Sequence, residues 1–228
     1  IYEKGKYIGN VNVLENKAYI FEGTTRKEAP VPSYVEDEVA KVREELMESA
    51  ASAEDELMEK FFDVGELTNE EMMHGLRQGI TDGSVVPLVC CSGTTRVGIP
   101  LLLDTIIDLM PSPAGKVLTG VNPKTGDPVE RVCADDQPFS ARVFKTMADP
   151  FVGKLSLVKV TSGVLTSATM LYNVNAEKTE KPGTIYFLKG KKQTNAAKVC
   201  AGDLCALAKL QSVATGNTLC DANNPVKF

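Results

Sequence analysis

The sequence predicts an α/β part followed by an all-β domain, and three observations predict this division. An apolar run at residues 85–91 leads through a Ser-Gly turn into a second apolar run at 99–109, which is typical of the strand, turn and helix of an α/β protein. Upstream of this unit apolar residues recur at helical spacing, and from Pro138 onward they alternate with polar residues in short runs. We therefore expect an α/β part at 1–110, a linker at 111–136 and a β domain at 137–228.

The composition is that of a globular protein. Of 228 residues, 43% are hydrophobic and 24% are charged, which excludes the disordered and fibrous classes. No apolar run approaches the roughly 20 residues that a membrane helix needs, so we expect no membrane partner. The first six residues carry neither an initiator Met nor the apolar region of a signal peptide, and we expect the chain to belong to a longer, cytoplasmic polypeptide.

The six cysteines are not spaced as metal ligands. None of them forms a Cys-x-x-Cys pair and the sequence has a single histidine, so we expect no metal site. Reduced thiols that act as small hydrophobic side chains are the simpler interpretation. We apply it to the whole set, which is Cys90, Cys91, Cys133, Cys200, Cys205 and Cys220.

The charge is unevenly distributed along the chain. Residues 33–82 carry 15 acidic and 4 basic residues, a net charge of −11. Residues 138–228 carry 12 basic and 5 acidic residues, a net charge of +7. Such asymmetry indicates that the C-terminal half faces an anionic partner, for which nucleic acid is the first candidate. A solvated surface with a modest excess of charge explains the same numbers equally well.

The N-terminal half reads as short strands followed by helices. Apolar residues at 11–13 and 18–21 predict one or two strands within 6–26, and Pro30 and Pro32 then interrupt the chain. From Val35 to Phe61 apolar residues recur every three or four positions, which predicts a long helix capped by Ser33. The Ala-Ser-Ala segment near residue 51 allows a break into two helices.

A second helix and the strand–turn–helix unit follow. Thr68 and Glu71 have the spacing of a capping box, and the helix that they open is expected to stop at Asp82-Gly83. Residues 85–91 predict a short buried strand, although Pro87 suits only its start or a bulge. The helix after the turn is expected to bury Leu101, Leu102, Ile106 and Leu109 and to end at Met110-Pro111.

The C-terminal half has the period of strands. Residues 139–145 and 154–160 alternate between polar and apolar, and turn residues follow at intervals of about ten. This spacing predicts a β-barrel or β-sandwich of about ninety residues.

No catalytic motif is complete in this sequence. It holds no Gly-x-x-x-x-Gly-Lys-Ser/Thr loop for phosphates, no Gly-x-Gly-x-x-Gly and no Gly-x-Ser-x-Gly. His74 has no evident second ligand or nucleophile, and we expect it to be a surface or packing residue. The Ser-Gly turn remains, because backbone N–H groups at the start of a helix suit a carbonyl oxygen or an anion. We expect no catalytic residues within these 228.

Nearly the whole chain resembles elongation factor G, the translational GTPase that drives ribosomal translocation. The matching segments occur in the family's order and spacing, and together they are specific. They are LMESAASAEDELMEKFF (46–62), ELTNEEM (66–72), VPLVCCSG (86–93), LLDTIIDLMPSP (102–113), DDQPFSARVFKTMADPFVGKLSLVKVTSGVL (135–165), AGD (201–203) and TGNTLCD (215–221).

The resemblance implies a division of roles. Residues 1–110 correspond to the C-terminal part of a GTPase domain with its inserted helical subdomain, and about 137–222 to the family's second domain, a translation-factor β-barrel. The family's guanine loop falls on Cys91, Ser92 and Gly93, where backbone N–H groups of Ser92 and Gly93 would face the guanine carbonyl oxygen. The phosphate loop, both switch regions and the Asn-Lys-x-Asp motif would lie upstream of Ile1. GTP and Mg are therefore cofactors implied for the longer parent, and we expect residues 1–228 alone neither to bind nor to hydrolyse GTP.

The sequence also departs from the family. Thr94-Thr95-Arg96-Val97-Gly98 stands where the family commonly has Phe-Lys-Asn-Lys-Gly, and Cys91 replaces a Gly. Residues 178–198 match the usual barrel pattern poorly. These departures favour a diverged elongation factor G-like paralogue over a housekeeping translocase.

The implied partner is the ribosome. The barrel would dock on small-subunit RNA, with Lys189, Lys191 and Lys192 as candidate contacts, and the helical insert would reach ribosomal proteins. DNA is not expected as a partner. Two alternatives stay open at this point: a stand-alone, non-enzymatic ribosome- or RNA-binding module, and part of a ribosomal-protection GTPase.

Overall fold

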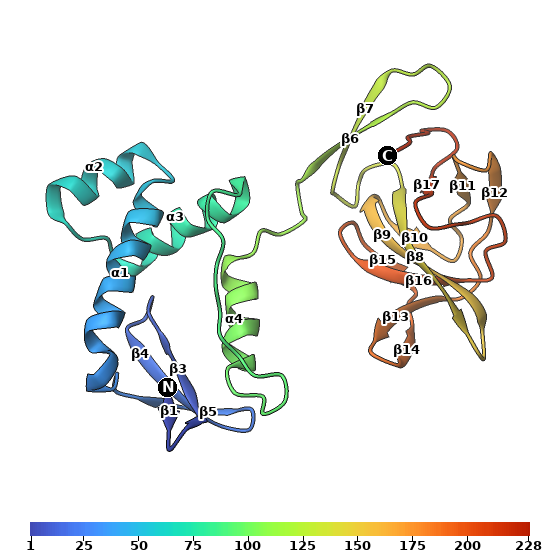
Figure 1. Ribbon diagram of the computed structural model, residues 1–228. Coiled ribbons are helices and arrows are strands. Elements are labelled where there is room, and N and C mark those ends of the chain that lie inside the picture. Colours follow the sequence, from blue (N-terminus) through green and yellow to red (C-terminus); the bar gives the residue numbers. More distant parts are fainter. The chain divides into compact units, whose positions relative to one another are not determined.

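The computed structural model describes all residues 1–228, and the chain forms two compact units, Ile1–Ser112 and Pro113–Phe228 (Figure 1). The first unit combines small antiparallel sheets with all four α-helices of the chain. The second unit contains only strands, turns and loops. The predicted fold class, an α/β part with a helical insert followed by an all-β domain, is confirmed.

Five short strands open the first unit. β1 (Tyr2–Glu3) pairs with β2 (Lys6–Tyr7), and β3 (Gly9–Asn12), β4 (Lys17–Glu22) and β5 (Thr25–Ala29) form an antiparallel meander. The expected one or two strands are thus too few. The sequence Thr-Arg-Lys-Glu-Ala of β5 is almost wholly exposed and lacks the apolar alternation by which strands are recognised.

The helices follow the predicted apolar periodicity. A 3₁₀ turn (Ser33–Val35) leads into α1 (Glu36–Ala51), and α2 (Asp55–Val64) follows the predicted break near residue 51. The expectation that Ser33 caps this helix is wrong, because the N-cap residue of α1 is Val35 and no side chain bonds there. The charges of Glu36, Asp37 and Glu38 in the first turn stabilise that helix end instead.

The third helix, α3 (Asn69–Asp82), begins and ends where the sequence predicts. The capping box is present: the Glu71 N–H donates to Thr68 Oγ1 over 3.3 Å, and the Thr68 N–H donates to the Glu71 carboxylate over 2.9 Å. Gly83 ends the helix with a φ of 88°, a conformation that favours glycine.

One apolar cluster holds the helical part together. It joins α1, α2, α3 and the end of α4 (Ile99–Leu109) through the buried residues Ala50, Ala51, Leu57, Leu67, Met72, Leu76 and Leu109. α1 and α3 approach each other so closely that a Cβ atom on Gly75 would lie 2.2 Å from the carbonyl oxygen of Ala50. A glycine in mid-helix is therefore required at this crossing.

The short buried strand expected at residues 85–91 is not formed. The segment is extended, but it pairs with no strand, and Val86 and Leu88 are 85% and 93% exposed. A strand is defined by a neighbour that takes up its backbone hydrogen bonds, and no strand of the first unit forms such a backbone ladder with this segment. The apolar composition of residues 85–91 predicts an extended segment, but it cannot predict whether a partner strand is present.

The following helix α4 is less buried than its composition predicts. Leu101 and Leu109 are buried as expected, Leu102 is half-buried, and Ile106 is 47% exposed. Gly98 precedes the helix with a φ of 79°, and Met110 ends it in an extended conformation.

The second unit begins with a hairpin where the sequence suggested a linker. β6 (Val117–Val121) pairs with β7 (Pro128–Val132), and Val121 also bridges to Lys227 near the C-terminus. The four prolines and three glycines of residues 111–137 supply its turns and ends. Turn-rich hairpins and linkers share this composition, which is why the two look alike in sequence.

The rest of the second unit is an eight-stranded antiparallel sheet in the order β12-β11-β17-β8-β9-β16-β13-β14 (Figure 1). Its strands are β8 (Ser140–Asp149), β9 (Gly153–Ser162), β11 (Leu171–Asn173), β12 (Lys178–Glu180), β13 (Ile185–Lys189), β14 (Lys192–Asn195), β16 (Leu204–Ala208) and β17 (Thr218–Cys220). A further pair is formed by β10 (Leu165–Thr166) and β15 (Lys198–Val199).

This sheet curls around one apolar core. Leu171 on β11 and Ile185 on β13 come from opposite sides of the strand order, yet both belong to the same buried cluster as Val143, Val158 and Leu207. A flat sheet of this width could not bring its two ends onto one core, so the arrangement is barrel-like.

The close crossing of α1 and α3 gives a stability prediction. Gly75→Ala places a methyl group against the Ala50 carbonyl and should lower the free energy of unfolding of the first unit by about 1–3 kcal/mol. Urea denaturation followed by helical circular dichroism measures it, because all four α-helices lie in that unit. Gly93→Ala, where an added Cβ meets nothing within 4 Å, is the matched control. If Gly75→Ala and Gly93→Ala have equal free energies of unfolding, the close crossing of α1 and α3 does not require glycine and the prediction is wrong.

Candidate functional site

The loop that connects residue 90 to α4 is closed on itself. The Ser92 N–H donates to the Val97 carbonyl over 2.8 Å, and the Arg96 N–H donates to the Ser92 carbonyl over 2.8 Å. The Ser92 hydroxyl accepts the Thr95 N–H over 3.2 Å. These hydrogen bonds join the two ends of the loop within the chain itself.

A polar contact fixes the start of this loop against the N-terminal strands. Asn10 Nδ2 donates to the Cys90 carbonyl over 2.6 Å. The Tyr7 hydroxyl lies 2.5 Å from Asn10 Oδ1 and 3.1 Å from the same carbonyl oxygen. Burial raises the pKa of Tyr7, so the hydroxyl keeps its proton for this contact. β3 thereby positions the loop.

The two residues predicted to contact guanine, Ser92 and Gly93, differ in whether their backbone N–H group is free to donate. The Ser92 N–H is engaged with the Val97 carbonyl, whereas the Gly93 N–H has no partner in the chain. Gly93 is also exposed, with open space where a side chain would stand. Of the two, Gly93 alone has a free backbone donor, and its role toward guanine stays a prediction.

A wide hollow lies beside this loop in the first unit. It measures about 1220 Å³, and its lining includes Leu76 and Ile80 of α3, Leu101 of α4 and the exposed Val86 and Leu88. At its rim Arg26 pairs with Asp104, and the Arg26 guanidinium lies 5.3 Å from the centre of the Tyr19 ring. The hollow is thus a mixed surface in which apolar groups predominate, and the unpaired extended segment borders it.

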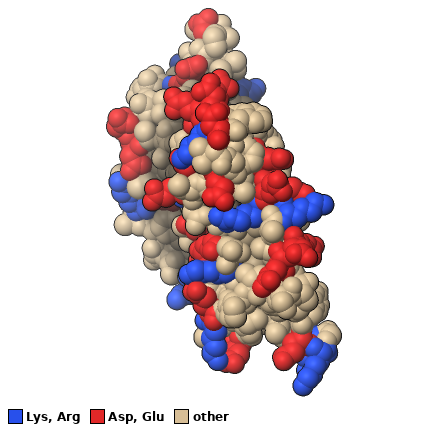
Figure 2. Space-filling view, turned by 90° about the vertical axis from the view of Figure 1, so that its left-hand side faces the viewer, with Lys and Arg blue, Asp and Glu red and all other residues tan.

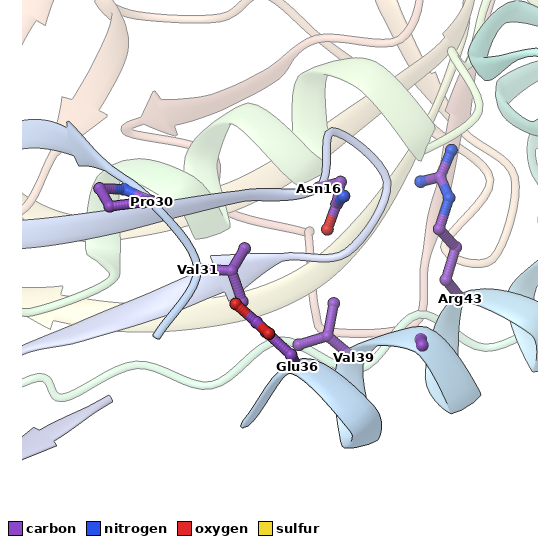
Figure 3. Close-up of a pocket in the computed structure, with 7 residues that line it drawn as sticks. Asn16, Pro30, Val31, Glu36, Val39 and Arg43 are labelled. Carbon is purple, nitrogen blue, oxygen red and sulfur yellow. The ribbon is translucent and has the colours of Figure 1, made fainter. Parts of the chain in front are cut away.

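A smaller hollow of about 440 Å³ lies between α1, the segment before it and the turn at Asn16 (Figure 3). In Figure 3, Val31 and Glu36 lie together on one side, while Arg43 extends along the other. Arg43 is already engaged, because its Nη1 atom donates to the carbonyls of Val13 and Leu14 over 2.7 and 2.8 Å. It holds the β3–β4 turn onto α1 and leaves this hollow without a free cation.

The three candidate lysines of the second unit gather on one hairpin. Lys189 and Lys192 face each other as the last pair of β13 and β14, and Lys191 lies in the turn between them. All three are exposed and none has a partner. The structure therefore brings together the lysines that the sequence singled out.

Sequence reasoning missed the contact that joins this hairpin to the β8–β9 turn. Gln193 Nε2 donates to Asp149 Oδ2 over 2.7 Å, and Asp149 Oδ1 accepts the N–H groups of Phe151 and Val152 over 2.9 and 3.0 Å. These hydrogen bonds lower the pKa of Asp149. An Asp followed by Pro is a recognised turn signal, but its partner forty-four residues away could not be found in the sequence.

Two further features of the structure concern metal ligands and membrane-spanning helices. No group of three or more His, Cys, Asp and Glu side chains is arranged to hold a metal ion. None of the helices has both the length and the apolar character needed to cross a membrane. His74 is an exposed residue whose Nε2 lies 2.8 Å from Glu54 Oε1, in agreement with the surface role expected for it.

The thiols fall into three groups by environment. Cys133, Cys205 and Cys220 are buried, and burial raises the pKa of Cys205 to about 12. Cys200 is half-buried, and the Asp135 carboxylate raises its pKa. All six thiols are free, but Cys90 and Cys91 are exposed, so the interpretation as small hydrophobic side chains is wrong for these two.

This grouping predicts thiol reactivity. With Ellman's reagent at mildly alkaline pH, Cys90 and Cys91 should react first and Cys200 more slowly, because a raised pKa lowers its thiolate fraction. The three buried thiols should react only after denaturation. The double variant Cys90→Ser/Cys91→Ser should remove the fast phase, and a fast phase that persists would contradict the assignment.

Comparison with known proteins identifies the class of fold. A family model described as elongation factor G domain 2 matches residues 138–222, which are the curled sheet of the second unit. A crystal structure of a protein from Thermus thermophilus is similar with a TM-score of 0.78 and 26% sequence identity. The similarity covers 99% of this chain and 31% of that chain, so the first unit is included.

The second unit is therefore a translation-factor barrel. More particularly, residues 138–222 match elongation factor G domain 2, and the chain over nearly its whole length is similar in fold to the Thermus protein. The resemblance to elongation factor G that the sequence shows is confirmed by this family match and by the similarity in fold. The chain spans less than a third of the length of the Thermus protein to which it is similar.

Proposed function

We propose that residues 1–228 are part of a cytoplasmic, elongation factor G-like GTPase that acts on the ribosome. The single observation that carries the proposal is the match of residues 138–222 to elongation factor G domain 2. In this proposal the second unit docks on the ribosome, and the first unit contributes one wall of a guanine-nucleotide domain. The activity belongs to the longer parent, with GTP and Mg as its cofactors.

Two features of the first unit support its place in a larger nucleotide domain. The extended segment 85–90 is apolar, exposed and unpaired, as a strand is when its neighbour is absent. The hollow of about 1220 Å³ beside it has a lining in which apolar residues predominate. A parallel sheet supplied by further polypeptide would cover both, and the loop that carries Gly93 would then lie at the carboxyl end of a sheet strand, where ligands bind.

Charge supports the docking role of the barrel. Residues 138–228 have a net charge of +7, and Lys189, Lys191 and Lys192 present three unpaired ammonium groups on one hairpin. Lysines that approach phosphates release condensed counterions, which favours binding and makes it dependent on salt. Small-subunit ribosomal RNA is the proposed partner of this surface.

The helical insert has the opposite character. Figure 2, which views the molecule from the side where α1 and α2 lie in Figure 1, shows acidic residues spread over that face with basic residues between them. Phe62 and Val64, at the end of α2, are 79% and 66% exposed. An acidic face with exposed apolar residues repels RNA and suits a basic protein, so we assign ribosomal proteins to this unit.

The lysine hairpin gives a direct test. The triple variant Lys189→Glu/Lys191→Glu/Lys192→Glu should weaken binding of the chain to purified small ribosomal subunits by at least about tenfold, since three phosphate contacts become repulsive. Co-sedimentation at several salt concentrations measures this. Lys178→Glu/Lys181→Glu/Lys227→Glu changes three other exposed lysines of the same unit and is the matched control. Equal binding by both variants would overturn the docking proposal.

A second test concerns the nucleotide. Calorimetric titration of residues 1–228 with GTP and Mg should show no binding in the micromolar range, because no phosphate loop is present in this sequence. The longer parent chain should bind under the same conditions, and Gly93→Pro should weaken that binding by removing the backbone donor. Micromolar affinity of residues 1–228 would contradict the assignment of the nucleotide site to a larger domain.

A further inference from the structure

We infer that Asn10 and Tyr7 are positioning residues for guanine recognition, because they hold the Cys90 carbonyl and thereby the loop that carries the free Gly93 N–H group. The inference rests on the proposed function, since guanine reaches this loop only in the nucleotide domain of the longer parent. It deepens that function by naming two side chains outside the loop that set the choice between guanine and adenine.

Tyr7 determines the orientation of the Asn10 side-chain amide. The Tyr7 hydroxyl donates to Asn10 Oδ1 over 2.5 Å. The amide oxygen accepts a hydroxyl proton and the amide nitrogen does not, so Oδ1 faces Tyr7 and leaves Nδ2 to donate elsewhere. Nδ2 donates to the Cys90 carbonyl over 2.6 Å, and the Tyr7 hydroxyl lies 3.1 Å from the same oxygen. Two side chains of β2 and β3 thus hold a carbonyl that is eighty residues away from Asn10.

The end of the loop packs closely against this contact. A Cβ atom on Gly98 would lie 2.7 Å from the Cys90 carbonyl oxygen and 3.1 Å from Asn10 Oδ1. Only a glycine leaves room for the loop to close over the hydrogen bond between Asn10 and Cys90. The Asn10 side chain therefore touches the loop where it begins and where it ends.

An apolar contact anchors the loop a second time. Val97 is 5% exposed and belongs to a buried cluster with Tyr19, Phe21 and Leu101. The Tyr7 side chain packs against this cluster, so its ring supports the second anchor while its hydroxyl supports the first. Residues 93–96, which lie between the two anchors, are exposed.

A donor that is held in place selects guanine over adenine. At the six position of the purine ring, guanine presents a carbonyl oxygen that accepts a hydrogen bond, and adenine presents an amino group that donates one. A fixed Gly93 N–H group opposite that position would bond to guanine, but with adenine it would face another donor and stay unpaired. A loop that could shift would avoid this unfavourable contact. The preference for guanine therefore depends on the side chains that hold the loop, which are Asn10 and Tyr7.

The first test measures the order of the loop in residues 1–228. Asn10→Ala should raise the hydrogen-exchange rate of the Ser92 amide about fivefold, because the loss of one hydrogen bond loosens the loop. The Leu102 amide, which donates to the Gly98 carbonyl in the first turn of α4, should keep its rate. An unchanged rate at Ser92 would overturn the inference.

Asn12→Ala is the matched control. Asn12 lies on the same strand as Asn10, but its side chain accepts the N–H groups of Leu14 and Glu15 and does not contact the loop. This variant also removes an asparagine side chain and its hydrogen bonds, yet it should leave the exchange of the Ser92 amide unchanged. Faster exchange at Ser92 in both variants would overturn the inference, since loosening of the loop would then not be specific to Asn10.

The second test identifies the atom of the base that is affected. It measures binding of the longer parent chain to GTP, to ITP, which has the same six-position carbonyl, and to 2-aminopurine riboside triphosphate, which lacks it. Asn10→Ala should weaken the binding of GTP and ITP about fivefold and leave the binding of the 2-aminopurine nucleotide unchanged. Tyr7→Phe should act in the same direction with a smaller effect, because Asn10 Nδ2 can still donate, and it replaces Asn10→Ala if that variant does not fold.

The outcomes separate the inference from the proposed function. If the unaltered parent binds GTP, but Asn10→Ala weakens all three nucleotides equally or none of them, the inference is wrong and the proposed function stands. If the unaltered parent binds none of the three nucleotides, the proposed function fails and the inference fails with it.

Discussion

Hydrogen bonding between neighbouring strands is the constraint on which both units depend. In the second unit eight strands pair in one antiparallel order, and the curl of that sheet allows residues as far apart in the strand order as Leu171 and Ile185 to share a core. In the first unit the same constraint is left unmet at residues 85–90, where an apolar extended segment has no paired strand. The second unit wraps its sheet around a single core, and the first unit presents an unpaired apolar segment.

The sequence predicts what depends on local chemistry. The capping box at Thr68, the stop at Gly83 and the break after α1 follow from side-chain types and spacing within a few residues, and the structure reproduces them. β5 and the β6–β7 hairpin were missed because polar strands and turn-rich segments carry no apolar alternation. The exposed state of Val86 and Leu88 depends on a partner strand, which no local pattern reports.

In the candidate sites, too, the features that depend on neighbouring residues could be predicted from the sequence, whereas those that depend on distant contacts could not. The lysines at 189, 191 and 192 were found because charge can be counted, and a two-stranded hairpin brings neighbouring positions together by itself. The bond between Asp149 and Gln193 joins residues distant in sequence and required the curled sheet to become visible. For the guanine loop, sequence located Ser92 and Gly93, but the structure alone distinguishes a donor that is engaged from one that is free.

The closed form of the loop at residues 90–98 has a consequence for how a nucleotide domain would work. Because hydrogen bonds between Ser92 and Val97 and between Asn10 and Cys90 order the loop within the chain, part of its conformational entropy is lost when the chain folds. In the nucleotide domain proposed for the longer parent, a purine would therefore contact a loop at residues 90–98 that is already ordered, so its binding would cost less conformational entropy.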